Sequence, residues 1–84
     1  MKRYVDDVRY SKSARKYIQS RTPKEKERLK SIINDNLKQL PAIGDIKPLH
    51  GYSDGRKRLR VGGTRIIFRY DEKGALLILL VLDI

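Results

Sequence analysis

Arginines dominate residues 56–70, and their spacing is suited to neutralising a phosphate. The stretch reads as two short strands joined at Gly62-Gly63, because paired glycines allow the positive φ values of a tight hairpin turn. Side chains alternate between the two faces of a strand. Five arginines are therefore predicted to share one surface: Arg56, Arg58, Arg60, Arg65 and Arg69. No acidic residue lies between positions 56 and 69. A guanidinium donates two parallel hydrogen bonds to phosphate oxygens, so this surface is suited to binding an anion.

The opposite face of the same hairpin is predicted to belong to a hydrophobic core. Leu59 and Val61 on the first arm would join Ile66 and Phe68 on the second arm. Lys57 alternates to this apolar side, away from the arginines. The hairpin is thus predicted to have one basic and one apolar face.

The composition restricts what such a surface can bind. The chain has 84 residues, a formal net charge of +10 and no cysteine. One domain is expected, without disulfides, cofactor or metal, and its basic character favours nucleic acid over an anionic membrane as the partner. The first residues lack the apolar run of a signal peptide, and residues 75–82 form an apolar run too short to span a bilayer. We therefore expect a cytoplasmic protein with no membrane partner.

Two helices are predicted before the hairpin. Residues 4–10 read as a strand, and Ser11 can cap a first helix that carries Ala14, Tyr17 and Ile18. A second helix is expected to start with Thr22 as the N-cap in a Thr-x-x-Glu capping box and to end at Pro41. Its apolar stripe consists of Leu29, Ile32, Ile33, Leu37 and Leu40. The basic residues off that stripe are interpreted as a solvated face: Lys24, Lys26, Arg28, Lys30 and Lys38.

The remaining segments complete an α+β fold. Residues 41–55 read as a connector in which Ile46 and Leu49 reach the core edge and His50 is structural. After the hairpin and an acidic turn, residues 75–82 are predicted to form a central strand buried on both faces. The expected order is strand-helix-helix-strand-strand-strand, with two helices on one face of a mainly antiparallel sheet and the other face partly open.

The hairpin and the order of elements carry a family resemblance. The pattern Leu49-x-Gly51-Tyr52, followed by Arg-x-Arg-Val-Gly-x-x-Arg-Ile at residues 58–66 and an acidic turn, resembles the RelE/ParE toxins of bacterial toxin–antitoxin systems. The resemblance is to the RelE branch and runs from residue 3 to the end of the chain. It implies a single RelE-like toxin domain over residues 1–84. It also implies a metal-independent endoribonuclease that enters the ribosomal A site and cuts messenger RNA by attack of the ribose 2′-OH on the adjacent phosphate, which inhibits translation. A cognate antitoxin is expected to block the basic face.

The resemblance also implies roles for individual residues. Arg65 matches the hairpin arginine that stabilises the scissile phosphate, and Arg58 is the second candidate catalytic residue. Arg58 matches a position in a basic strand that supplies a lysine base in some members, but an arginine stays protonated and is a poor general base. The candidate RNA-binding residues are Arg56, Lys57, Arg60 and Arg69.

One departure from the family leaves alternatives open. Family members continue after the last strand into a tail with a further catalytic arginine and a tyrosine, whereas this sequence stops at Ile84. We therefore expect a domain without the catalytic tail, and the activity of the chain as given stays open. The alternatives are a ParE-like toxin of the same fold that inhibits DNA gyrase, against which the hairpin pattern argues, and a basic protein that binds RNA without cutting it.

Overall fold

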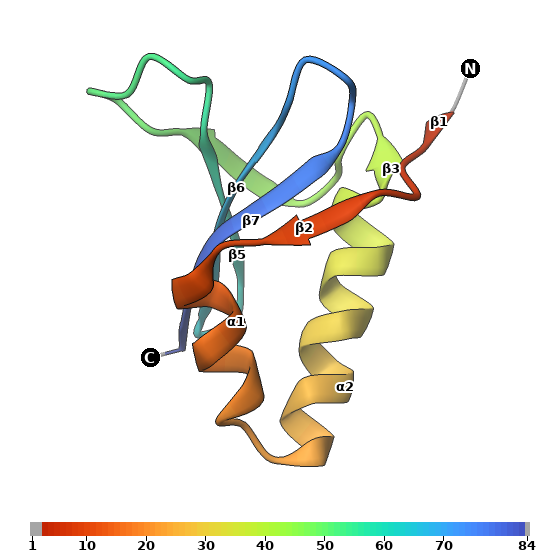
Figure 1. Cartoon of the computed structure of the whole chain (residues 1–84), viewed down its shortest axis with the longest axis vertical. Coiled ribbons are helices and arrows are strands. Elements are labelled where there is room, and N and C mark those ends of the chain that lie inside the picture. Colours follow the sequence, from red (N-terminus) through yellow and green to blue (C-terminus); the bar gives the residue numbers. More distant parts are fainter. Residues whose placement is uncertain (1–2, 84) are drawn as a thin grey trace.

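A five-stranded sheet with two helices packed on one face forms the framework of the protein (Figure 1). The computed structural model describes residues 3–83. The strands lie in the order β2-β7-β6-β5-β4, where only the β2–β7 pair is parallel. Their bounds are β2 (Val8–Tyr10), β4 (Asp45–Pro48), β5 (Lys57–Val61), β6 (Thr64–Tyr70) and β7 (Leu76–Asp83). The expected α+β architecture with a mainly antiparallel sheet is confirmed.

Both helices start at the predicted caps. The Ser11 hydroxyl accepts a hydrogen bond from the Ala14 N–H at the start of α1 (Lys12–Gln19). The Thr22 hydroxyl accepts from the Glu25 N–H at 3.2 Å at the start of α2 (Pro23–Ile32), and it donates to the Glu25 carboxylate. These bonds satisfy backbone donors that the first turn of a helix leaves free.

The second helix ends earlier than predicted. After Ile32 the chain makes one π-helical segment, η1 (Ile33–Leu37), and then enters the short strand β3 (Gln39–Leu40). This strand pairs antiparallel with β1 (Arg3–Tyr4). Residues 39 and 40 are therefore part of a two-stranded sheet and do not continue the helix. The predicted stripe is nevertheless the core face, because four of its residues are buried and Leu40 is half-buried against them.

The prediction that the last strand is buried on both faces is wrong. The core lies between the helices and the sheet, and β7 contributes Leu76, Ile78 and Val81 to it. The core-facing residues of β7 change from even-numbered (Leu76, Ile78) to odd-numbered (Val81) along the strand. The cause is a register irregularity, since Phe68 pairs with Ile78 while Ile67 pairs with Leu80. The leucines on the other side of β7 are only half-buried, and Leu82 is 43% exposed, because the helices cover one face alone. β7 lies inside the sheet between β2 and β6, and β6 is the middle strand.

Part of the predicted connector is a strand. β4 pairs antiparallel with β5 and places Ile46 opposite Leu59, so Ile46 packs against the core as expected. Leu49 is half-buried and lies outside the core cluster. β4 begins after Gly44, which has a φ of 120°; a Cβ there would lie 2.8 Å from Asn36 Nδ2 and 2.9 Å from Leu59 Cδ1. The chain can pass this point only with glycine.

The predicted first strand is likewise two short strands, β1 and β2, separated by the buried Val5. None of the helices within residues 3–83 has the length and apolar character needed to cross a membrane. The expectation that the domain lacks the family's catalytic tail concerns no described residue and stays a prediction.

Candidate nucleic-acid interface

The β5–β6 hairpin presents its arginines on the sheet face that points away from the helices, here called the open face. The two strands are joined by the predicted glycine turn, in which Gly62 has a φ of 58° and Gly63 has no positive φ. Arg60 pairs with Arg65 and Arg58 pairs with Ile67, so these side chains share the open face. Cross-strand partners lie on the same side of a sheet at Cβ separations of about 5 Å. The predicted common face is confirmed for Arg58, Arg60, Arg65 and Arg69, whereas Arg56 precedes β5 and has no cross-strand partner in the register.

Lys57 does not join them. It pairs with Phe68, whose side chain is buried beneath the helices, so the lysine lies at the edge of the core face. It lines a hollow of about 500 Å³ together with residues of β4, β6 and the segment before β4. The predicted alternation is correct, and Lys57 therefore lies across the sheet from the arginine surface.

β4 adds two residues to the open face that the sequence reasoning missed. Lys47 pairs with Arg58, and Asp45 pairs with Arg60. The signal was present in the alternation of Asp45, Ile46 and Lys47, where polar side chains flank an apolar one. The connector thus contributes both a lysine and a carboxylate next to the candidate catalytic arginine.

Arg58 is recessed rather than exposed. Its side chain is 20% exposed, and its Nη2 lies 3.9 Å from Asp45 Oδ1. Within residues 3–83 its Nε is buried and has no hydrogen-bond partner. An unsatisfied buried donor costs about 1–3 kcal/mol, and an anionic oxygen reaching Nε from the open face would remove that cost. Arg58 is therefore prepared to donate to a ligand.

Arg56 and Arg69 lie in a different environment, around a carboxylate from the loop before β5. Asp54 Oδ2 is 2.7 Å from Arg56 Nη2 and 3.7 Å from Arg69 Nε. The Arg56 guanidinium also stacks on Tyr52, with 4.1 Å from its Cζ to the ring centroid. The hydrogen bonds from Arg56 lower the pKa of Asp54 to about 2, so the carboxylate is charged at neutral pH. The basic surface therefore includes an acidic residue that lies just outside the stretch free of acids.

Arg28, one of the basic residues of α2, forms a hydrogen bond to the β5–β6 hairpin and does not belong to a solvated face. Arg28 Nη1 donates to Thr64 Oγ1 at 2.8 Å, and Thr64 is buried at the start of β6. Thr64 immediately precedes Arg65. The contact ties the second helix to the end of the hairpin where Arg60 and Arg65 pair, and it corrects the interpretation of Arg28.

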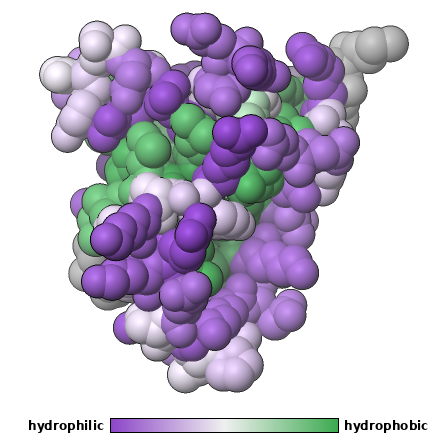
Figure 2. All heavy atoms as spheres, viewed as in Figure 1, coloured by the Kyte–Doolittle hydropathy of each residue, from purple (hydrophilic) through white to green (hydrophobic). Residues whose placement is uncertain are grey.

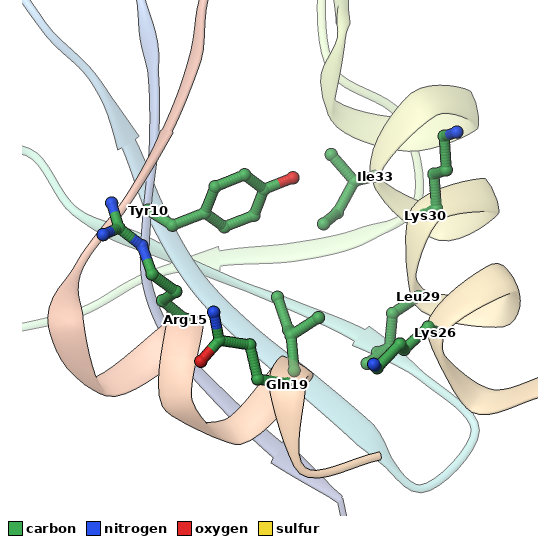
Figure 3. A pocket seen from close by; sticks show the side chains of 8 residues that line it. Tyr10, Arg15, Gln19, Lys26, Leu29, Lys30 and Ile33 are labelled. Atoms are coloured by element: carbon green, nitrogen blue, oxygen red, sulfur yellow. The ribbon is translucent and has the colours of Figure 1, made fainter. Parts of the chain in front are cut away.

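A groove between α1 and α2 is the second notable surface (Figure 3). Its volume is about 360 Å³, and its apolar lining comes from Ile18, Leu29 and Ile33. Tyr10 reaches from β2 toward Ile33, and burial raises the pKa of its hydroxyl. Basic side chains line the rest of the groove: Arg15, Lys26 and Lys30.

Apolar side chains also gather over the sheet in the surface view of Figure 2, between polar loops and the polar outer surfaces of the helices. The outward leucines of β7 belong to the open face, where Leu80 pairs with Ile67 and Leu82 pairs with Arg65. The open face is thus basic along β5 and apolar along β7.

Comparisons with solved structures identify the fold. The chain superposes on a chain of the toxin–antitoxin complex RelBE2 from Mycobacterium tuberculosis with a TM-score of 0.76 and 24% identity, over 96% of this chain and 91% of that chain. The protein has a RelE-like toxin fold. A chain of the RelB–RelE antitoxin–toxin complex from Methanococcus jannaschii matches with a TM-score of 0.62 and 26% identity, over 88% of this chain and 87% of that chain.

A third RelE-like match is the RelE–RelB complex from Pyrococcus horikoshii OT3, with a TM-score of 0.60 and 23% identity over 92% of both chains. No protein-family model matches the sequence, and no curated protein is significantly similar to it. The RelE-like fold thus extends over nearly all of this chain. In the sheet of this chain β6 is the middle strand and β5 lies beside it.

Proposed function

We propose that this RelE-like protein is the toxin of a toxin–antitoxin pair and a ribosome-dependent endoribonuclease that inhibits translation. The observation that carries the proposal is the cross-strand pair Arg60–Arg65 on the open face, beside the recessed Arg58 with its unpaired Nε. Arg60 and Arg65 form no ion pair with the side chains of residues 3–82, which leaves both guanidinium groups available to an anion on that part of the surface. The RelE–RelB complexes with the same fold support the assignment as a toxin.

The proposed reaction is attack of a ribose 2′-OH on the adjacent phosphate. The 2′-oxygen forms a bond to phosphorus, the bond to the 5′-oxygen breaks, and the products are a 2′,3′-cyclic phosphate and a 5′-hydroxyl. Arg65 and Arg58 would neutralise the charge that develops on the phosphate oxygens. The 2′-OH must lose a proton and the leaving oxygen must gain one, and arginine is unsuited to the first task. Lys47 and Asp45 lie opposite Arg58 and Arg60 and are the proposed candidates for these two tasks.

The proposed partners are messenger RNA on the ribosome and a cognate antitoxin in the cytoplasm. The net charge of +10 favours a polyanionic partner. The groove between α1 and α2 has an apolar lining and basic side chains around it, which suits an antitoxin segment with apolar and acidic positions. The RelB chains in the similar structures are antitoxins bound to such a fold.

A second candidate is a protein that binds RNA on the open face without cutting it. The specific observation in its favour is that Arg58, the cross-strand partner of Lys47, is an arginine. An arginine holds its proton too firmly to act as a base. The two candidates share the RNA-binding surface and differ only in whether proton transfer occurs there.

Cleavage of messenger RNA on programmed ribosomes tests the proposal. We expect the wild-type protein to cut in the A site and Arg65→Ala to cut about 10²–10³-fold more slowly, the usual effect of removing a donor to a developing oxyanion. Lys24→Ala is the matched control, because it removes one positive charge from an exposed residue of α2. Binding of RNA without cleavage would favour the second candidate. Inhibition of DNA gyrase with no effect on ribosomes would overturn both.

A further inference from the structure

Arg56 and Arg69 form a two-arginine site around one carboxylate. Both oxygens of Asp54 lie within hydrogen-bonding distance of the Arg56 Nε, at 3.1 and 3.2 Å, and Oδ2 also accepts from Nη2 at 2.7 Å. Arg69 approaches the same Oδ2 from β6, at 3.7 Å. A guanidinium recognises the oxygens of a phosphate with the same fork geometry that it uses for a carboxylate.

We propose that Arg56 and Arg69 are a phosphate-binding site for RNA, and that Asp54 fills this site in the free protein and is displaced when RNA binds. The inference rests on the proposed function, in which RNA binds the open face. Asp54 is thus an internal competitor that imitates the phosphate.

The loop that carries Asp54 is built so that the carboxylate can leave. Residues 50–55 are exposed, and the loop is bounded by Gly51 and Gly55, which have φ values of 86° and 77°. A Cβ at either glycine would meet no atom within 4 Å, so these glycines are not required by close packing. Moving the loop away from β6 therefore breaks polar contacts and uncovers little of the core.

The proposed site lies at the opposite end of the open face from the Arg60–Arg65 pair. Arg65 and Arg69 are on the same strand, four residues and about 13 Å apart at 3.3 Å per residue. Arg69 pairs with Leu77, which in turn pairs with Arg9 of β2, so a third arginine continues the line across the sheet. A strand of RNA held at Arg65 can thus reach a second anion site while staying on the same surface.

Salt dependence distinguishes a filled site from an empty one. Each phosphate contact to a single strand contributes about −0.7 to the slope of log affinity against log salt, because counterions are released. In the wild-type protein the displaced Asp54 takes up a cation, which offsets the release at this site. We therefore expect Asp54→Asn to steepen the slope by about 0.7–1.4, corresponding to one or two contacts.

The test measures binding of a single-stranded RNA oligonucleotide by fluorescence anisotropy over a series of KCl concentrations. Asp54→Asn should bind about tenfold more tightly than wild type at low salt, with the steeper slope. Glu72→Gln is the matched control: it removes the same charge from the hollow that Arg69 also lines, but Glu72 makes no ion pair within residues 3–83. In an Arg56→Ala/Arg69→Ala background, Asp54→Asn should have no more effect than Glu72→Gln.

Equal effects of Asp54→Asn and Glu72→Gln would overturn the inference, and so would the absence of RNA binding by every variant. Tighter binding of an acidic antitoxin segment to Asp54→Asn, with RNA affinity unchanged, would assign the two arginines to the protein partner instead. The proposed function is tested separately by cleavage. If Arg65→Ala abolishes cleavage while Asp54→Asn leaves the salt slope unchanged, the function stands and the inference fails. If the wild-type protein binds RNA but cuts none, while Asp54→Asn steepens the salt slope, the inference stands and the proposed cleavage fails.

Discussion

Both ends of the open face carry a pair of arginines, but only one of the two pairs is bound to a carboxylate. At one end Arg60 and Arg65 pair across the hairpin, and neither forms an ion pair with the side chains of residues 3–82, although Asp45 lies opposite Arg60 in β4. At the other end Arg56 and Arg69 share Asp54. Like charges placed opposite each other destabilise a sheet, so the first end keeps an unfavourable arrangement that an anion would relieve. The comparison indicates that arginine content alone does not define a binding surface, because the neighbouring carboxylates decide which guanidinium groups are available.

The largest expected effect separates the two ends directly. Replacing both Arg60 and Arg65 by alanine should reduce A-site cleavage by at least about 10²-fold, because the charge on the phosphate is no longer neutralised. Replacing both Arg56 and Arg69 should reduce it by less than about tenfold, since Asp54 already competes for them. Cleavage rates on programmed ribosomes provide the measurement. Equal losses for the two double variants would show that the ends are equivalent.

Both ends depend on the same core, which predicts a large effect on stability. Ile33, the first residue of η1, is 3% exposed and belongs to the core cluster, so Ile33→Ala should lower the free energy of unfolding by about 2–5 kcal/mol. Ile43 is 51% exposed, and Ile43→Ala should cost less than about 0.5 kcal/mol. Chemical denaturation measures both. A small loss for Ile33→Ala would show that the helical stripe does not support the sheet.

Much of this arrangement could be predicted from the sequence, because it depends on neighbouring residues. Ser11 and Thr22 cap helices through contacts three residues away, and the alternation along residues 57–70 decides which side chains share a face. Lys57 shows how reliable the alternation is, because even this charged side chain lies on the core side of the sheet, opposite Phe68.

The features that the sequence did not reveal depend on contacts between distant segments. β4 is a strand because it pairs with the edge of β5, although Gly44 and Pro48 near its ends indicated a connector. The burial of Arg58 follows from that added strand, and so does the placement of Lys47. The link from Asp54 to Arg69 joins a loop to the far end of the hairpin, and no local pattern encodes it.

A smaller effect is expected where α2 supports the Arg60–Arg65 end. Arg28→Ala removes the hydrogen bond to the buried Thr64 hydroxyl and should lower the free energy of unfolding by about 1–2 kcal/mol. Lys26→Ala, on the same helix, should be nearly neutral. Chemical shifts in NMR spectra should move at residues 62–65 and stay constant around Asp54. Shifts that extend equally to the Asp54 loop would show that Arg28 supports the whole sheet rather than one end.

The smallest effect concerns the pH dependence of the Asp54 end. Arg56 and Arg69 lower the pKa of Asp54 from 3.8 to about 2, chiefly through the side-chain hydrogen bond from Arg56. A carboxyl whose pKa is lower in the folded state stabilises that state above its unfolded pKa, and this contribution is lost as the pH falls from about 4 to about 2. The contribution to stability at neutral pH should be slight, because the pair is exposed to solvent and screened. The pKa itself is the sharper measurement, by NMR titration of the carboxyl carbon. Arg56→Ala should return the pKa toward 3.8, and Arg69→Ala should move it less, in keeping with the longer distance of 3.7 Å. The opposite order would mean that Arg69 is the principal partner of Asp54, and an unchanged pKa in both variants would show that the carboxylate does not hold the two arginines in solution.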